Sequence, residues 1–148
     1  STTSPWTAPT AVTALNTGAY EKWAAVCSSG YVIVSRAVTN NGQDLFEGDI
    51  NTGANNAITQ FNTANNEQGS LLTSDCLHVY FQSNRAGNFD IYTASRLTMQ
   101  SAWSNPTMLT DFNTATYSEE DPWISPDAKT FVFASNANGN KDVYISTR

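Results

Sequence analysis

Acidic side chains recur at a similar place in each third of the chain. They are Glu21, Glu67 and the run Glu119-Glu120-Asp121. Carboxylate oxygens are ligands that Ca²⁺ prefers, so a ring of these residues would make a site for a hard cation. The sequence has no Ca²⁺-loop spacing, which favours a second interpretation in which these residues cap strands or face solvent.

Few residues are available for a hydrolytic site. His78 is the only histidine, which excludes a His-rich zinc or manganese site within one chain and leaves a single base for triad chemistry. No Gly-x-Ser-x-Gly elbow, Walker loop or dinucleotide fingerprint is present. Arg36 and Arg85 could bind an anionic group through paired hydrogen bonds, although surface salt bridging is the more ordinary role.

The elements that must position these side chains are short strands in a repeated unit. Residues 73–84 match residues 125–136 at an offset of 52, with similar turn and strand residues in register. Residues 4–17 match residues 101–114 at an offset of 97, and Trp, Pro, Thr and Asn-Thr recur in both. A more divergent copy occupies the first third of the chain. The segment 4–17 therefore corresponds to the end of a unit whose beginning is missing.

Each unit predicts four short strands, at positions A to D, separated by turn residues. Position A is predicted near 22–26, 70–73 and 122–125, and position B at 31–35, 79–83 and 131–135. Position C is predicted at 44–48, 90–94 and 142–146, and position D at 10–15, 57–61 and 107–112. Position B is apolar on consecutive residues, which indicates burial on both faces. The predicted fold is all-β, with the order D-ABCD-ABCD-ABC.

Two stretches carry a resemblance to a known family, Ser83-Asn84-Arg85-Ala86-Gly87-Asn88-Phe89-Asp90-Ile91-Tyr92 and Ser125-Pro126-Asp127. They resemble the TolB-like, WD-like β-propeller repeat. The resemblance implies one domain, residues 1–148, with blades at about 17–61, 62–112, and 113–148 plus 1–16. The sequence departs from the pattern at Cys76 and Ala128, near the turn glycine position, and at Ala137, where Arg85 would recur.

Three blades are too few to close a ring, because propellers have about 4 to 8 blades. TolB-like propellers are typically six-bladed, so we predict a homodimer in which position D of each subunit completes the last blade of the other. The predicted interface pairs Thr10, Ala11, Val12, Thr13, Ala14 and Leu15 with Asp142, Val143, Tyr144, Ile145 and Ser146. The alternatives are a fragment of a longer propeller and a minimal propeller of natural or designed origin.

Propellers usually bind ligands at the channel mouth, where the D-to-A and B-to-C loops gather. For this chain the resemblance implies a set of ligand-binding residues: Tyr20, Glu21, Arg36, Glu67, Arg85, Tyr117, Glu119, Glu120 and Asp121. The equivalent aspartates Asp44, Asp90 and Asp142 are predicted to bond the backbone of their own turns. The tryptophans are predicted to be core residues, Trp6 and Trp103 at the outer strand and Trp23 and Trp123 at the innermost strand.

Cys27 and Cys76 both fall in A-to-B turns of adjacent blades, hence on one face of the propeller. A disulfide would close a loop of about 49 residues and stabilise the fold by roughly 4 kcal/mol in the chain-entropy model. Spacing alone does not show whether their Cα atoms come within about 7 Å. The sequence is therefore compatible with a Cys27–Cys76 disulfide and with two free cysteines.

Composition excludes several classes of partner. Charged residues make up 14% of the chain, the net charge is -6, and the seven Lys and Arg do not cluster, which argues against nucleic acid and anionic membrane surfaces. No apolar run approaches the roughly 20 residues that span a bilayer.

The leading hypothesis is a non-enzymatic binding or scaffold module, which holds a protein or small polar ligand at the channel mouth and needs no cofactor. The alternative is a propeller hydrolase or lyase with a cation, such as Ca²⁺, in the central channel. Membership of the TolB-like family would imply a periplasmic or secreted bacterial protein.

Overall fold

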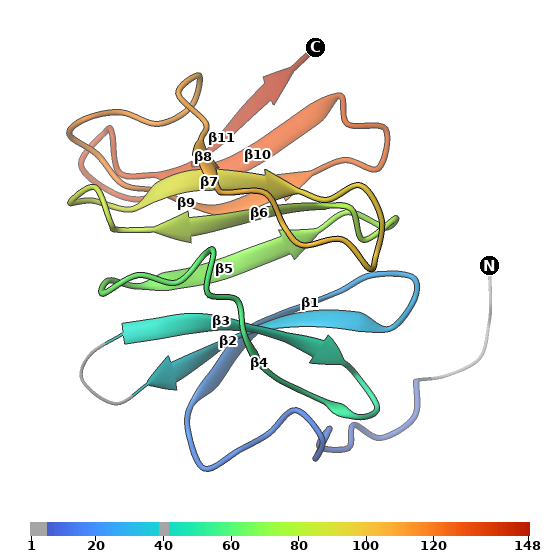
Figure 1. The fold of residues 1–148 in the computed structure, drawn as a ribbon. Coiled ribbons are helices and arrows are strands. Elements are labelled where there is room, and N and C mark those ends of the chain that lie inside the picture. The colour runs from blue at the N-terminus through green and yellow to red at the C-terminus, as the bar shows by residue number, and fades with distance from the viewer. Residues whose placement is uncertain (1–5, 39–41) are drawn as a thin grey trace.

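The computed structural model describes residues 6–38 and 42–148. Within these ranges the chain forms strands, turns and loops and contains no helix, so no helix there is long and apolar enough to cross a membrane. The strands form three antiparallel sheets that are stacked face to face (Figure 1). The predicted all-β class is confirmed.

Three sheets follow one another along the chain. The first contains β1 (Glu21–Val26), β2 (Tyr31–Val38), β3 (Gly42–Asp49) and β4 (Gly53–Ala57) in that order. The second contains β5 (Glu67–Leu72), β6 (His78–Ser83), β7 (Asp90–Ser95) and β8 (Thr107–Met108). The third has only β9 (Glu119–Ile124), β10 (Thr130–Ser135) and β11 (Asp142–Thr147). Within the described ranges its outer strand β11 pairs only with β10, as the order D-ABCD-ABCD-ABC predicts.

Position D is where the predicted strands differ from the observed ones. No strand forms at 10–15 or at 58–61, and the strand predicted at 107–112 is only two residues long. In each copy the chain turns instead, because one carbonyl accepts two backbone N–H groups: Ile58 O from Phe61 and Asn62, and Leu109 O from Phe112 and Asn113. The same turn forms at Val12, whose carbonyl accepts from Leu15 and Asn16.

The hydrophobic core lies between neighbouring sheets. Phe61, Phe81 and Leu45 are fully buried between the first and second sheets, with Phe61 and Phe81 stacked at 5.1 Å. Ile91, Phe131 and Phe133 fill the space between the second and third. Position B is buried on both faces in β2, as predicted, since consecutive residues of 32–35 are 0–1% exposed. Among the described strands, no contact joins the first sheet to the third.

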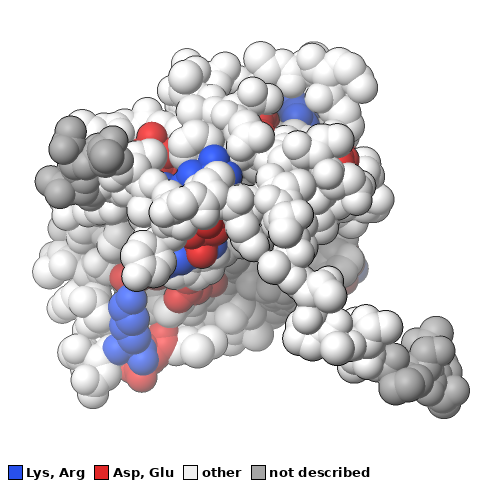
Figure 2. All heavy atoms as spheres, turned by 90° about the horizontal axis from the view of Figure 1, so that it is seen from below, with Lys and Arg blue, Asp and Glu red and all other residues white. Residues whose placement is uncertain are grey.

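Charged side chains are sparse on the surface. Figure 2 shows the face on the side of the first sheet, where most atoms are uncharged and basic groups lie beside acidic ones. This face shows no large patch of Lys and Arg of the kind that binds nucleic acid.

The A-to-B turns share one backbone conformation. Gly30, Cys76 and Ala128 all have positive φ, at 85°, 64° and 56°. This region favours glycine, which explains why the family pattern has glycine there and makes Cys76 and Ala128 strained departures from it. Cys76 is bonded to Cys27 in a disulfide with a Cα–Cα distance of 5.4 Å, which joins the first two sheets at these turns.

Replacing Cys27 and Cys76 together with serine is expected to lower the free energy of unfolding by roughly 4 kcal/mol, because the unfolded chain loses its cross-link. Urea denaturation monitored by tryptophan fluorescence measures the change. The wild-type protein under reducing conditions is the control and should unfold at the same urea concentration as the variant. Equal midpoints for the oxidised wild type and the variant would contradict a stabilising bridge.

Candidate functional site

Glu67 is the most buried of the predicted site residues, with 0% exposure. Its carboxylate accepts hydrogen bonds from the Thr63 N–H at 2.8 Å, the Thr63 hydroxyl at 2.9 Å and the Ser83 hydroxyl at 2.6 Å. The Arg85 guanidinium lies 3.4 Å away. Buried charges are stable only when paired and hydrogen-bonded, and Glu67 meets both conditions. This glutamate therefore fastens the D-to-A loop to β6.

The other two glutamates at this position have equivalent partners. Glu119 accepts from the Thr114 N–H at 2.9 Å and from the Ser135 hydroxyl at 2.9 Å, and is 1% exposed. Glu21 accepts from the Thr17 N–H at 3.0 Å, and the Thr17 hydroxyl together with the Arg36 guanidinium lowers its pKa. The recurring carboxylates thus hold threonines of their own loops. This is the strand-capping interpretation that the sequence favoured.

Both predicted anion-binding arginines contact the backbone of the preceding turn. Arg85 donates to the Phe61 carbonyl, and Arg36 donates to the Leu15 carbonyl at 3.1 Å. Arg36 also pairs with Glu21 at 3.0 Å and is 7% exposed, so it is not a surface salt bridge. In the third sheet Ala137 occupies the position of Arg85. Glu119 accordingly has no arginine partner among the described residues.

Asp90 does not have the role that its recurrence predicted. Among the described residues no hydrogen bond reaches its carboxylate, although the residue is only 3% exposed. Burial raises its pKa, and the nearby charge of Glu119 raises it further. Burial likewise raises the pKa of Asp44, and the charge of Glu67 raises it further. Each junction between sheets therefore brings two carboxylates together, and only the first junction adds an arginine.

The innermost strands carry a bulge that sequence reasoning missed. Trp23, Gly69 and Asp121 occupy equivalent positions and have positive φ, at 43°, 61° and 53°. The register of each innermost strand shifts at this point. Gln82, which is buried, stabilises one bulge by accepting the Asp121 N–H at 2.7 Å. The glycine in the middle of β5 was the only sequence signal for it.

The bulge helps to explain why two tryptophan predictions are wrong. Trp23 and Trp123 are 40% and 45% exposed, whereas Trp103 is 6% exposed and does belong to the core. Trp6 is 100% exposed and packs against none of the described residues. Tyr20 and Tyr117 are exposed at 79% and 39%, as contact residues would be.

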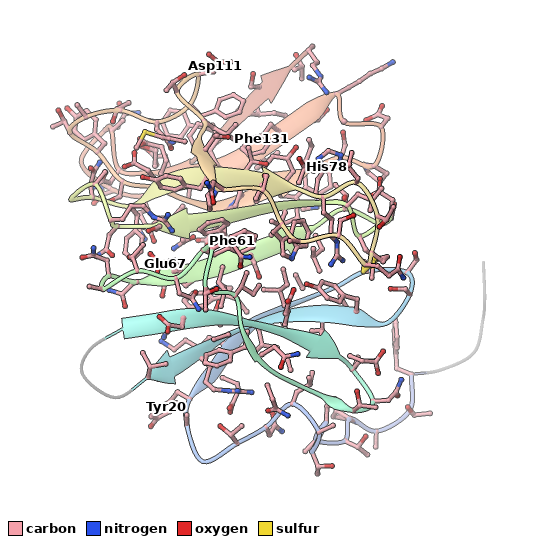
Figure 3. All side chains as sticks on the ribbon, viewed as in Figure 1. Tyr20, Phe61, Glu67, His78, Asp111 and Phe131 are labelled. Carbon is pink, nitrogen blue, oxygen red and sulfur yellow. A yellow bond between two sulfur atoms is a disulfide. The ribbon has the colours of Figure 1, made fainter. Side chains whose placement is uncertain are left out.

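A cavity lies at the opposite end of the sheets from the predicted ligand residues. Figure 3 shows Glu67 near one end of the strands and His78 near the other. The cavity of about 770 Å³ is at the His78 end, where Val26, Leu72 and Ile124 of the three innermost strands lie beside the A-to-B turns. None of the predicted ligand residues lines it.

The polar lining of the cavity comes from the turns of all three sheets. It includes Ser28, Ser74, Asp75, His78, Ser125 and Arg148. The Thr73 hydroxyl and the Leu77 N–H both donate to Asp75, and these bonds lower its pKa. The Ser28 and Ser125 hydroxyls donate to Ser74 O and Asp127. Among the described residues, the groups without a partner are the His78 ring, the Ser74 hydroxyl and part of the Arg148 guanidinium, whose Nε donates to Ala128 O. In 6–38 and 42–148 no group of three or more His, Cys, Asp and Glu could hold a metal ion.

Neither a protein-family model nor a curated protein matches the sequence. Among solved structures, the chain is similar to one from Agrobacterium tumefaciens whose protein is described as a TolB, with a TM-score of 0.63 and 18% identity. The match covers 82% of this chain and 40% of that one, so this chain spans less than half of that protein's length. The likeness supports a β-propeller fold. The three sheets are accordingly called blades 1, 2 and 3 below.

Replacing Asp90 with asparagine tests the carboxylate pair between blades 2 and 3. A carboxyl whose folded-state pKa is raised favours folding at low pH, and this contribution is lost as the pH rises through that pKa. Asp90→Asn is therefore expected to raise the free energy of unfolding at pH 7 by about 1 kcal/mol or less. The gain should disappear near pH 3, where both Asp90 and its unfolded reference are protonated.

Asp127→Asn is the matched control, because the Ser125 hydroxyl and the Lys129 N–H lower the pKa of Asp127. Its effect has the opposite sign: stability is lost at pH 7, and the loss becomes smaller as the pH falls through the lowered pKa of Asp127. Urea denaturation of both variants at the two pH values gives the comparison. Destabilisation by Asp90→Asn at pH 7 would show that the Asp90 carboxylate contributes a favourable contact.

Proposed function

We propose that this chain is a non-enzymatic β-propeller binding module, which holds a protein segment or a small polar ligand in the cavity beside His78. The observation that supports this proposal is the cavity itself, of about 770 Å³ and lined by all three blades. Ligand-binding clefts measure roughly 300–1,000 Å³ and combine an apolar wall with a few polar groups. Here Val26, Leu72 and Ile124 provide that wall.

The chemistry of the cavity favours a ligand that offers hydrogen-bond acceptors. Asp75 already accepts two bonds from its own turn, whereas the His78 ring and the outer nitrogens of Arg148 have no bond within the described chain. A guanidinium binds carboxylates through paired hydrogen bonds. The proposed ligand class is therefore a carboxylate-bearing molecule, such as an amino acid, an organic acid or a peptide end.

The opposite end of the blades is the weaker candidate for ligand binding. Glu21, Glu67 and Glu119 use their carboxylates to hold loop threonines, and Arg36 and Arg85 bind backbone carbonyls. A ligand there would have to displace bonds that fix the fold. Binding at the His78 end requires no such change.

The proposal includes a six-bladed ring made from two copies of the chain. Its support is the unpaired outer strand β11 of blade 3 together with residues 6–16, which repeat the end of blade 2. A periplasmic or secreted location is part of the same proposal. The Cys27–Cys76 disulfide supports it, because disulfides persist in oxidising compartments.

A ligand-observed NMR screen of amino acids, short organic acids and tetrapeptides with free carboxyl ends tests the binding site. We expect mutually competitive binders whose affinity falls on the order of 10-fold in His78→Ala, the effect of about one lost hydrogen bond to a charged group. Tyr20→Ala, at the other end of the blades, is the matched control and should leave affinity unchanged.

Three results would overturn part or all of this proposal. Binding that is lost in Tyr20→Ala but retained in His78→Ala would place the site at the D-to-A loops. Turnover of a probe that stops when bound metal is chelated would favour the hydrolase or lyase alternative. Failure of all carboxylate probes to bind would exclude the proposed ligand class.

A further inference from the structure

Trp103 sits in an aromatic and cationic pocket where blade 2 meets blade 1. The Arg96 guanidinium lies 4.2 Å from the centroid of its ring and 4.2 Å from that of Tyr31. Phe61 closes the pocket at 5.7 Å from Trp103. Arg96 is held in place because its Nε donates to the Cys76 carbonyl at 2.9 Å. Cation–π contact with a buried indole is among the stronger forms of this interaction.

Blade 3 contains the same pocket without its tryptophan. Arg148 is equivalent to Arg96, and its Nε donates to the Ala128 carbonyl at 2.8 Å, just as Arg96 donates to Cys76. A cavity of about 210 Å³ lies beside it, lined by Tyr80, Phe112 and Phe131 among others. Phe112 is the counterpart of Phe61. The site that Trp103 fills in blade 2 is thus an open aromatic cavity in blade 3.

Trp6 is the residue of this chain that matches Trp103. The two lie 97 residues apart, the offset at which residues 6–17 repeat 103–114. Trp6 is 100% exposed. One copy of the chain therefore has both an exposed tryptophan and an unfilled cavity of the matching type.

A second pair of unmatched groups lies at the other end of the segment. The Asn62 side chain accepts the Leu45 N–H at 2.8 Å and donates to the Leu45 carbonyl at 3.0 Å. Asn113 does the same to Ile91, at 2.7 and 2.8 Å. Each asparagine thereby replaces one residue of a neighbouring strand at the outer edge of its blade.

Asn16 is the third asparagine of this set and has no such partner. It follows the same backbone turn, in which the Val12 carbonyl accepts from Leu15 and Asn16. The turn is already anchored to blade 1, because Leu15 is buried and its carbonyl accepts from Arg36. The Asn16 side chain is nevertheless exposed and makes no hydrogen bond within the described chain.

Val143 is the strand residue that Asn16 would bind. It occupies in β11 the position of Leu45 in β3 and of Ile91 in β7. Leu45 and Ile91 are both 0% exposed, whereas Val143 is 78% exposed and Ile145, two residues further on, is 69% exposed. The unpaired N–H and C=O groups of an outer strand are a template for another strand, above all where the strand also exposes apolar side chains.

These complementary groups do not meet within one chain. Leu15 packs against blade 1, and β11 is the outer strand of blade 3, at the far side of the stack (Figure 1). No contact joins the described strands of these two blades. A second copy of the chain offers both missing surfaces at the correct spacing, because the segment and its target are copies of one continuous piece of blade 2.

We infer that residues 6–16 of one copy complete blade 3 of a second copy, with Trp6 in the cavity beside Arg148 of the partner subunit and Asn16 on the backbone of Val143 of the partner subunit. The inference rests on the six-bladed ring proposed above and identifies the contacts that close it. Two-fold symmetry repeats the contacts at the second joint.

The register of blade 2 gives the register of each joint. Tyr92 pairs with Met108, and the Leu109 N–H donates to Ile91. At the joint Ala11 accordingly lies opposite Tyr144 of the partner subunit, and the Val12 N–H donates to Val143 of the partner subunit.

Sedimentation equilibrium of the 148-residue protein tests this contact. The wild type is expected at twice the 16.1 kDa chain mass. Trp6→Ala and Asn16→Ala are each expected to raise the dimer dissociation constant on the order of 30-fold, the effect typical of residues at the centre of an interface. Both residues are exposed in the single chain, so neither change threatens its fold. Leu97→Ser, at a residue 90% exposed and outside the segment, is the control and should leave the dimer unchanged.

A double-mutant cycle links Trp6 to its cavity. The effects of Trp6→Ala and Arg148→Ala should be strongly non-additive, because each removes the same contact. Cysteines introduced together as Ala11→Cys and Tyr144→Cys should join two chains covalently on a non-reducing gel. Additive effects, or no covalent dimer, would overturn the proposed register.

The outcomes separate the contact from the ring. A dimer that survives both Trp6→Ala and Asn16→Ala would overturn the contact and leave a ring held by other surfaces. A wild-type protein that sediments at 16.1 kDa would overturn both the contact and the two-copy ring. Ligand binding beside His78 is judged separately by the NMR screen.

Discussion

A two-bond contact between an asparagine amide and the backbone of a neighbouring strand determines where each blade ends. At Asn62 and Asn113 this contact satisfies an N–H of the adjacent strand that would otherwise be unpaired at the edge of the sheet, and it adds a second hydrogen bond to a carbonyl that already accepts a backbone N–H. The main chain is then free to turn away toward the next blade. The threonine that follows binds the buried glutamate of that blade, so one blade positions the next.

This dependence explains why the recurring charged residues serve the fold more than a ligand. Glu67 is buried at the junction between blades 1 and 2, and Thr63, Ser83 and Arg85 compensate its charge. Glu119 keeps the threonine and serine but has no arginine partner among the described residues, and its charge raises the pKa of Asp90. The blades are therefore not interchangeable, and charge compensation differs between the two junctions. The end of the blades without these bonds is the end that has the cavity.

Much of the fold could be predicted from the sequence, because β-strands leave a simple periodic signal and the unit is repeated. The three sheets, their order and the unpaired edge of blade 3 all follow from the repeat. The predicted D strands are longer than the observed ones, because the side-chain amides of Asn62 and Asn113 bond the neighbouring strand where the backbone of a longer D strand would do so. Sequence patterns do not reveal such side-chain bonds. The bulges at Trp23 and Asp121 were missed for a related reason: only Gly69 carries a residue type that signals positive φ. The predicted ligand residues and the cavity lie at opposite ends of the blades, because the prediction followed the loops that usually form the channel mouth and the sequence carries no signal for a cavity at the A-to-B turns.

By itself the sequence determined the repeat, the strand order and the offset that relates Trp6 and Asn16 to Trp103 and Asn113, because these are properties of residue order alone. Only the tertiary structure decided which of these equivalent residues have partners. Trp103 and Asn113 are packed and bonded, whereas Trp6 and Asn16 face solvent, because a contact depends on which surfaces lie adjacent in space. The Cys27–Cys76 bridge was likewise left open by spacing and decided by the 5.4 Å between the two Cα atoms.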